Sequence, residues 1–363
     1  MHRFLTRGAV LAASMTLLAS PAYAGDTPRD ELAAGWLAAQ PTSGIVHNPN
    51  FGGFDDFGLT VDLGLALSEI GGQQAVVDQI RDALALNVDT YTTGVDWGSS
   101  DVYAGSTAKL VVFAQTVGAD PTTYGGVDLV ARLKARVIVD GPSKGRIQDQ
   151  TAGTDYANTI GQAFAVQGLA AAGSGKAVPA LAFLLKQQCA KGYFRLSLTK
   201  KKSAKDQTCD GGNTATVSAP DTDATAIALL SLDALGSTNP KVLASVTSAK
   251  KWLQSRQKAN GSFGGGTSTE ASNSNSTGLA GWALGEVGAC GAAQQAANWV
   301  ARWQVDGAPL DAELGAIAYD RTGYAAATTA AEITDANRDQ WWRATAQAAP
   351  ALRNLVLSDC RSR

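Results

Sequence analysis

Residues 221–236 of the chain read DTDATAIALLSLDALG, and this stretch decides the fold. An acidic pair follows Pro220, small and apolar residues then recur at helical spacing, and Gly236 ends the run. An acidic start and a glycine end are typical of the two caps of an α-helix. Because the helix has almost no charged face, other parts of the chain must bury it on most sides.

The same design occurs six times along the chain. Each copy is rich in Ala, Gly, Ser and Thr, is nearly free of charge, and usually ends in a glycine. The final glycines recur about every 50 residues on average, which is typical of repeat architectures. We expect the six copies to form inner helices, at residues 58–71, 104–118, 156–173, 221–236, 273–288 and 311–323.

Six further helical patterns alternate with these copies and carry more charge on one face. They lie at residues 31–40, 75–86, 127–137, 178–188, 242–257 and 292–304. Twelve helices in six antiparallel pairs bury their apolar faces when the pairs stack and the stack closes into a ring. The sequence therefore predicts an all-α protein, an α6/α6 toroid in which six inner helices line a central cavity and six outer helices surround them. An extra C-terminal helix, roughly residues 339–357 with Trp341 and Trp342, is expected to pack outside the ring.

The composition and the first residues place the protein in a broad class. The chain has 363 residues, 45% of them hydrophobic and 17% charged, with a net charge of -2. This excludes a disordered chain and gives no support to nucleic-acid binding. Arg3 and Arg7, a short apolar run and the sequence Ala22-Tyr23-Ala24 are typical of a secretory signal peptide. We therefore expect a signal peptide at 1–24, a single toroid domain at 25–363, secretion to the extracellular side and no transmembrane anchor.

Four cysteines lie after the signal peptide, and an even number in an exported chain favours disulfides. Three pairings are possible, and we expect Cys189 to pair with Cys209 and Cys290 with Cys360. The first pair would enclose Lys200, Lys201, Lys202 and Lys205, which we expect to form a solvated loop, with a polyanion site as the alternative. No CxxC spacing occurs and His47 is the only histidine after processing, so we expect neither a metal site nor a cofactor.

One linker resembles the motif of a known superfamily. Gln257-Lys-Ala-Asn-Gly261-Ser-Phe263-Gly264 follows an outer helix, and weaker copies begin at Gln188 and Gln304. The glutamine can tie a helix end to the next turn, while the aromatic ring fills the joint. The pattern resembles the Q-x-x-x-G-x-W/F repeat of the prenyltransferase and squalene-cyclase superfamily. That resemblance implies an α/α toroid but no single function, since the superfamily includes terpene cyclases, protein prenyltransferase β subunits, cobalamin carriers and thioester domains.

A second resemblance concerns Asp221-Thr222-Asp223-Ala224-Thr225. It is similar to the acid motif D-x-D-D-T-A of class II terpene cyclases, which implies that Asp223, assisted by Asp221, protonates an alkene. Ala224 stands where the family has a third carboxylate, so the acid motif is incomplete. The alternative is a helix N-cap followed by an acidic first turn, where the helix amides favour ionised carboxylates.

Polar and aromatic residues gather at the starts of the predicted inner helices. In a closed ring all six starts point the same way, so these residues would surround one mouth of the cavity. Helix caps explain the carboxylates and amides but not the aromatic side chains beside them, and this combination is typical of ligand sites. The expected ligand-binding residues are Asp55, Asp56, Asp96, Trp97, Tyr103, Asp155, Tyr156, Asn158, Asn275 and Glu313.

Three functions follow from these patterns. The first is a secreted binding protein that holds a small amphipathic molecule in the toroid. The second is a cyclase-like enzyme, a terpene cyclase or mutase type of isomerase, with Asp223 as its acid. The third is a surface module that binds a cell-surface protein.

Overall fold

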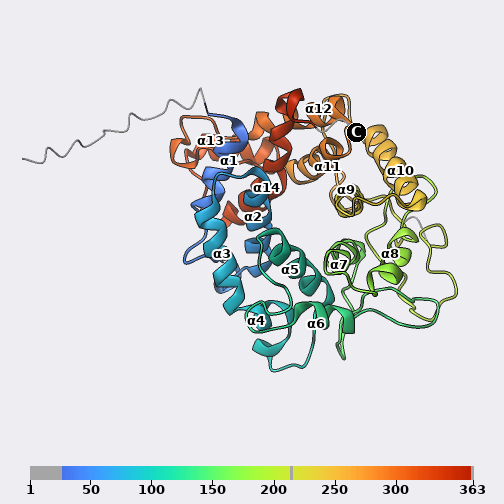
Figure 1. Ribbon diagram of the computed structural model, residues 1–363. Helices are drawn as coiled ribbons and strands as arrows, with labels where there is room; N and C mark the ends of the chain where they lie inside the picture. Colours follow the sequence, from blue (N-terminus) through green and yellow to red (C-terminus); the bar gives the residue numbers. More distant parts are fainter. Residues whose placement is uncertain (1–26, 213–215, 361–363) are drawn as a thin grey trace, which may run out of the picture.

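The computed structural model describes residues 27–212 and 216–360, and it is almost entirely helical (Figure 1). The described residues contain fourteen α-helices and one small antiparallel sheet, which joins β1 (His47–Asn48) to β2 (Phe54–Asp55). The predicted signal peptide lies outside the described residues.

Six helices form a closed inner ring. Each packs on the next one along the chain, and the last packs on the first, so the ring has no open edge (Figure 1). The inner helices are α2 (Phe57–Ile70), α5 (Ala104–Thr116), α7 (Thr159–Ala171), α9 (Thr222–Asp233), α11 (Ser274–Glu286) and α14 (Asp335–Ala348).

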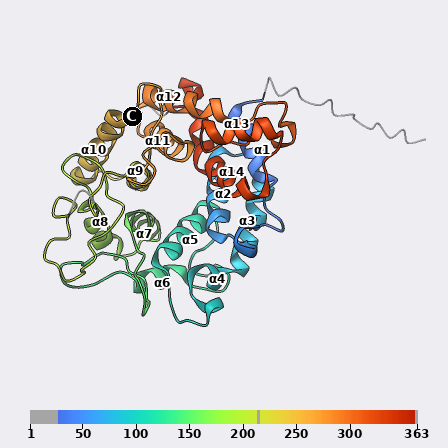
Figure 2. The same cartoon turned by 180° about the vertical axis from the view of Figure 1, so that it is seen from behind.

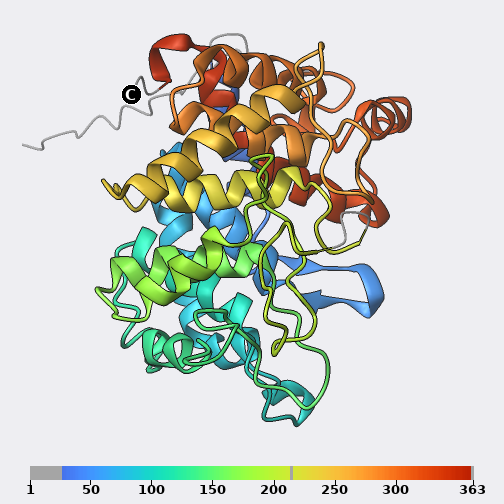
Figure 3. The ribbon, with the colours of Figure 1, turned by 90° about the vertical axis from the view of Figure 1, so that its right-hand side faces the viewer.

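Six outer helices cover the ring, and they alternate with the inner helices along the chain (Figure 2). They are α1 (Arg29–Ala38), α3 (Gln74–Leu86), α6 (Leu129–Ala135), α8 (Ala177–Leu185), α10 (Pro240–Arg256) and α12 (Cys290–Val300). Most turns that lead from an inner to an outer helix are short, whereas the linkers that lead back inward are long. The long linkers therefore gather at the N-terminal ends of the inner helices, where the β1–β2 ribbon also projects (Figure 3).

The expected positions of five inner helices and all six outer helices are confirmed, but the sixth inner helix was placed wrongly. Residues 311–323 form only the 3-10 turn Asp311–Glu313, an extended stretch and the start of a further helix, α13 (Arg321–Ala330). Gly315 explains the break, because it has a φ of +96° and packs tightly against the carbonyl group of Leu32. The helix that completes the ring is α14, which the sequence analysis had placed outside it.

A buried hydrogen bond shows why α14 is the inner helix. Near the start of three other inner helices, a threonine hydroxyl accepts the backbone N–H of the preceding linker: Thr60 from Val46, Thr225 from Phe194, and Thr277 from Phe263, at 2.9–3.0 Å.

In α14, Thr345 also accepts a linker N–H, that of Ile317 at 2.8 Å, although Thr345 lies in the last turn of its helix and not near the start. The linker thus docks on α14 as other linkers dock on their inner helices. The helices outside the twelve-helix arrangement are α13 and the short α4 (Val88–Thr92).

The linker glutamines tie neighbouring repeats together, as expected. Gln257 Nε2 donates to the carbonyl oxygen of Gly261 in its own turn, at 3.0 Å, and to that of Ala292 in the next outer helix, at 2.8 Å. Gln304 Nε2 donates to the carbonyl oxygen of Arg29 at 2.7 Å, which joins the last outer helix to the first. Phe263 is fully buried in its joint.

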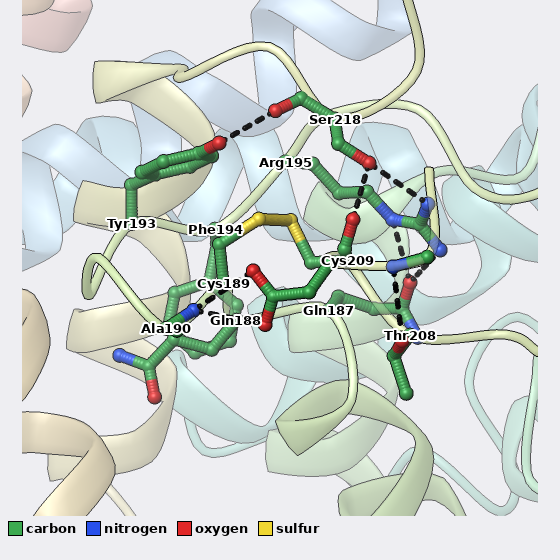
Figure 4. Close-up of a disulfide and its surroundings, with 12 residues drawn as sticks. Gln187, Gln188, Cys189, Ala190, Tyr193, Phe194, Arg195, Thr208, Cys209 and Ser218 are labelled. Atoms are coloured by element: carbon green, nitrogen blue, oxygen red, sulfur yellow. Dashed lines mark hydrogen bonds between the residues drawn. A yellow bond between two sulfur atoms is a disulfide. The ribbon is translucent and has the colours of Figure 1, made fainter. Parts of the chain in front are cut away.

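Both expected disulfides are present, Cys189–Cys209 and Cys290–Cys360. Beside the first bond lies Arg195, a fully buried cation whose guanidinium donates to Gln187 Oε1 at 2.7 Å (Figure 4). Burial, with the charge of Arg146, lowers the pKa of Arg195 to about 10.

The lysine run enclosed by this disulfide contains no helix or strand, as expected of a loop. Lys200, Lys201 and Lys205 are exposed. Lys202 differs, because its Nζ lies 2.9 Å from Asp155 Oδ2 and donates to Gln148 Oε1 at 2.8 Å.

Candidate functional site

A cavity of about 290 Å³ lies at the centre of the ring, and all six inner helices contribute to its wall. The lining residues come from the middle and the C-terminal halves of these helices. The cavity therefore lies toward the rim with the short turns, away from the long linkers.

The wall combines apolar and polar side chains. Its aliphatic and aromatic members are Leu65, Ala66, Val112, Phe164, Ile227, Leu230, Ala234, Leu279, Trp282 and Ala346. Its polar members are Asp62, Glu69, Thr116, Gln167, Ser231, Asp233, Glu286 and Gln347. Mostly apolar walls with a few polar groups at fixed positions are what small-molecule sites use.

An indole nitrogen and a hydroxyl oxygen of wall residues have no hydrogen-bond partner among the described residues. They are Trp282 Nε1 on α11 and Ser231 Oγ on the neighbouring helix α9, and both atoms are shielded from solvent. Leaving a buried donor unpaired costs about 1–3 kcal/mol. Two residues of the cavity wall therefore carry polar atoms that the described residues leave unsatisfied, and both atoms lie behind the surface of the cavity.

Charge on the wall is partly balanced by two ion pairs. Lys109 Nζ of α5 lies 2.6 Å from Asp62 Oδ1 of α2. Burial alone would lower the pKa of Lys109, but the charges of Asp62 and Tyr91 outweigh it and the pKa is raised. Arg353, in the 3-10 segment after α14, pairs with Glu69. The ion pair of Asp62 with Lys109 keeps the wall polar on one side.

Asp221 is the N-cap of α9, because its Oδ1 accepts the N–H of Ala224 at 2.8 Å. The cap alternative is therefore confirmed for this residue. Burial nevertheless raises the pKa of the Asp221 carboxyl, against the effect of the backbone N–H groups that it accepts.

Asp223 lies one turn before the cavity wall, since Ile227 is the first wall residue of α9. Burial and the charge of Asp221, opposed by the Ser276 hydroxyl, raise the pKa of Asp223 to about 6. The sequence places this carboxyl where helix amides would lower its pKa, but burial has the larger effect and raises it. A linker covers the group: a Cβ placed on Gly265 would lie 2.9 Å from Asp223 Oδ2.

None of the ten expected ligand-binding residues is among the described residues that line the central cavity. They lie at the opposite, N-terminal rim. Asp56 and Asn158 are N-caps of α2 and α7. Asn275 comes nearest to the cavity, because its Nδ2 donates to Oε1 of the wall residue Gln347 at 2.8 Å.

Three of these residues belong to ion-pair networks. Asp56 pairs with Arg343, which also pairs with Asp339. Asp155 Oδ2 lies 3.2 Å from Arg146 and 2.9 Å from Lys202. Glu313 pairs with Arg338 at 2.6 Å and accepts the indole N–H of Trp36 at 2.8 Å. Glu313 thus holds its linker to α1 and α14, whereas Asp155 joins two linkers to each other.

The remaining members face solvent or are half-buried. Trp97 is 83% exposed and Tyr156 is 78% exposed, so neither ring lies in a cavity. Asp96 is exposed beside Trp97, and Tyr103 is half-buried at the N-cap position of α5. Asp55 Oδ1 lies 3.2 Å from His47 Nδ1 on the β1–β2 ribbon.

The residues of the cavity wall were not predicted from the sequence, although the sequence contains a signal for them. Glu69, Asp233 and Glu286 each stand two or three residues before the final glycine of a copy that is otherwise nearly uncharged. All three lie on the wall. A carboxylate at a repeated position near the end of a buried helix marks the end of the ring that holds the cavity.

Among residues 27–212 and 216–360, no group of three or more His, Cys, Asp and Glu side chains is arranged to hold a metal ion. Within the same ranges, no helix is both long enough and apolar enough to cross a bilayer.

No family model matches the sequence, and no curated protein matches it. Solved structures match the fold. A protein from Actinoplanes gives a TM-score of 0.60 at 16% identity, over 90% of this chain and 98% of that chain. The type II terpene cyclase MstE from Scytonema, in complex with its substrate geranylgeranyl dihydroxybenzoate, gives 0.59 at 15% identity, over 91% and 97%. A glycosidase in complex with glucose gives 0.55 at 16% identity, over 91% and 97%.

At such low identities these similarities establish the fold alone. The chain has the α/α toroid fold that type II terpene cyclases and glycosidases share. This confirms the fold that the glutamine, glycine and aromatic linker pattern implied.

Proposed function

We propose that the protein is an exported binding protein, and that its central cavity holds a small amphipathic molecule. The observation that carries the proposal is the pair of unpartnered polar atoms, Trp282 Nε1 and Ser231 Oγ, on residues of an otherwise largely apolar wall. A ligand that turns these two side chains toward it, and supplies an acceptor for the indole N–H and a group for the hydroxyl, would remove the cost of leaving both unpaired.

The wall restricts the chemistry of this ligand. A volume of about 290 Å³ lies at the small end of ligand sites and corresponds to about ten water molecules. The acidic side chains Asp62, Glu69, Asp233 and Glu286 accept hydrogen bonds and disfavour an anion. We therefore expect a neutral or cationic molecule with hydroxyl or amine donors at one end and an apolar surface at the other.

The comparisons support a ligand-binding function without naming the ligand. One structure of this fold is a complex with a prenylated dihydroxybenzoate and another is a complex with glucose. The fold thus serves proteins whose ligands are apolar and proteins whose ligands are polyols. Export is supported by the pattern of residues 1–24 and by the two disulfides, which persist in oxidising compartments.

A cyclase-like enzyme is the second candidate, and the pKa of Asp223 favours it. A carboxyl group that is protonated near neutral pH is what a general acid needs. The enzyme hypothesis predicts turnover of a polyprene that Asp223→Asn abolishes. The position of Asp223 one turn from the wall, beneath the linker at Gly265, favours the binding function instead.

Native mass spectrometry of the protein from culture supernatant tests the proposal. We expect a chain that starts at Gly25, lacks about four hydrogens because of its two disulfides, and carries extra mass that is lost on denaturation. A bare mass, together with polyprene turnover that depends on Asp223, would overturn the binding function and favour the enzyme.

A further inference from the structure

A second concave site lies on the outside of the ring, separate from the central cavity. It is a groove of about 910 Å³ lined by α6, by the turn before α8 and by α8 itself. Four lysines line it: Lys134 on α6, Lys144 in the linker after α6, and Lys176 and Lys186 at the two ends of α8. We call it the lysine groove.

The positive charge of the lysine groove is not balanced by acidic side chains. No acidic side chain is among its lining residues, and none of its four lysines forms an ion pair with a residue of the described chain. The chain as a whole carries a net charge of -2, so this concentration of cations is local. Four like charges around one groove repel each other, and an anionic occupant would relieve that repulsion.

The positive surface continues beyond the groove. Ser143, next to Lys144, donates its hydroxyl to the carbonyl oxygen of Lys202 at 2.7 Å. This bond places the loop with the exposed Lys200, Lys201 and Lys205 beside the groove. The lysine run that the sequence analysis singled out therefore belongs to a larger basic surface.

The groove also has an apolar component, which restricts the occupant. Val178 on α8 is 73% exposed and lines the groove together with Val130, Pro179 and Ala182. A polyphosphate chain has no apolar group to cover these side chains, and a flat lipid surface cannot enter a concave site. A peptide can supply both carboxylates and apolar side chains.

The spacing of the lysines indicates an extended peptide. Lys176 and Lys186 are separated by ten residues of helical backbone, which corresponds to about 15 Å. An extended chain advances about 3.3 Å per residue, so carboxylates about four to five residues apart would match the two lysines.

We propose that the lysine groove binds an extended acidic segment of a partner protein, with carboxylates on Lys176 and Lys186 and an apolar side chain on Val178. This interaction is independent of a ligand in the central cavity.

The test uses the full chain and a fluorescein-labelled decapeptide with glutamates at positions 2 and 6 and a central leucine. A matched peptide with glutamines at both positions is the first control. We expect the glutamate peptide to bind at least tenfold more tightly than the glutamine peptide, with an affinity that falls as salt rises. Equal binding of the two peptides would overturn the proposal.

The second control is a matched pair of substitutions. Lys176→Gln with Lys186→Gln should weaken binding of the glutamate peptide about tenfold or more. Lys241→Gln with Lys251→Gln removes two exposed lysines with the same ten-residue separation on α10, and it should change binding less than twofold. An equal loss in both variants would show non-specific attraction. Tighter binding of inorganic polyphosphate than of the peptide would contradict a peptide occupant.

Discussion

Gly278 of α11 lies directly against the backbone of Ala348 at the end of α14, so that a Cβ at position 278 would overlap the Ala348 Cα. Through this contact α14 packs tightly on α11, and α14 also packs on α2. The absence of a side chain at Gly278 therefore allows the last inner helix to close the ring.

Gly278→Ala should destabilise the protein by about 2 kcal/mol, because the methyl group forces the two helices apart. Urea unfolding followed by circular dichroism measures this change. Gly35→Ala on α1 is the matched control: nothing lies within 4 Å of its Cβ position, so the better helix propensity of alanine should stabilise the chain by up to about 1 kcal/mol. Destabilisation by both variants would contradict the specific contact.

Deprotonation of Asp223 should lower the free energy of unfolding as the pH rises from about 4 to about 6. Its pKa is about 6 in the folded chain and 3.8 in the reference state, so the folded chain binds the proton more tightly. The stabilising contribution of the protonated form is complete below pH 4 and is lost as the pH rises through 6, on the order of 2 kcal/mol.

Asp223→Asn keeps the neutral form at every pH. We expect it to stabilise the protein by about 1–2 kcal/mol at pH 7 and by almost nothing at pH 4, as measured by thermal unfolding at both pH values. Asp96→Asn, at an exposed position, should change stability by less than about 0.5 kcal/mol at either pH. Equal destabilisation by Asp223→Asn at both pH values would show that the ionised group is stabilising.

The two disulfides should contribute unequally to stability. They join residues 20 and 70 positions apart, so loop entropy predicts losses of about 3 and about 4 kcal/mol when each pair is replaced by alanine. Guanidinium unfolding of Cys189→Ala/Cys209→Ala and of Cys290→Ala/Cys360→Ala measures both values. A larger loss from the shorter loop would mean that local packing around Arg195 outweighs loop entropy.

Most of the fold was predictable because each repeat carries its own signals. Small residues, a polar start and a final glycine located five inner helices, and the linker glutamines behave as their positions suggested. The sixth inner helix was predicted as a helix, at residues 339–357, but it was placed outside the ring. The first turns of α14 contain Asp335, Arg338, Asp339 and Arg343 and so resemble those of an outer helix. In the structure, α14 is recognised as an inner helix by the buried Thr345, which accepts a linker N–H as Thr277 of α11 does.

The cavity was harder to predict than the ring. The starts of the inner helices carry the most polar residues, but helix capping and linker ion pairs use several of them, including Asp56, Asp155 and Glu313. The position of the cavity depends on which side chains leave space near the opposite rim. The register of the inner helices determines those side chains, and residue type alone does not. Only the carboxylates at the ends of the copies, such as Glu286, mark that rim in the sequence.

Binding of a ligand in the central cavity is best tested with the variant Trp282→Phe. The quantity to measure is its affinity for the molecule that copurifies with the protein. Phenylalanine keeps an aromatic ring and removes only the indole N–H and part of the ring area. Trp303→Phe is the matched control, because Trp303 Nε1 is also shielded and unpartnered among the described residues but does not line the central cavity. We expect about a tenfold loss of affinity for Trp282→Phe and less than a twofold change for Trp303→Phe. Unchanged affinity in Trp282→Phe, or an equal loss in both variants, would contradict a ligand held in this cavity.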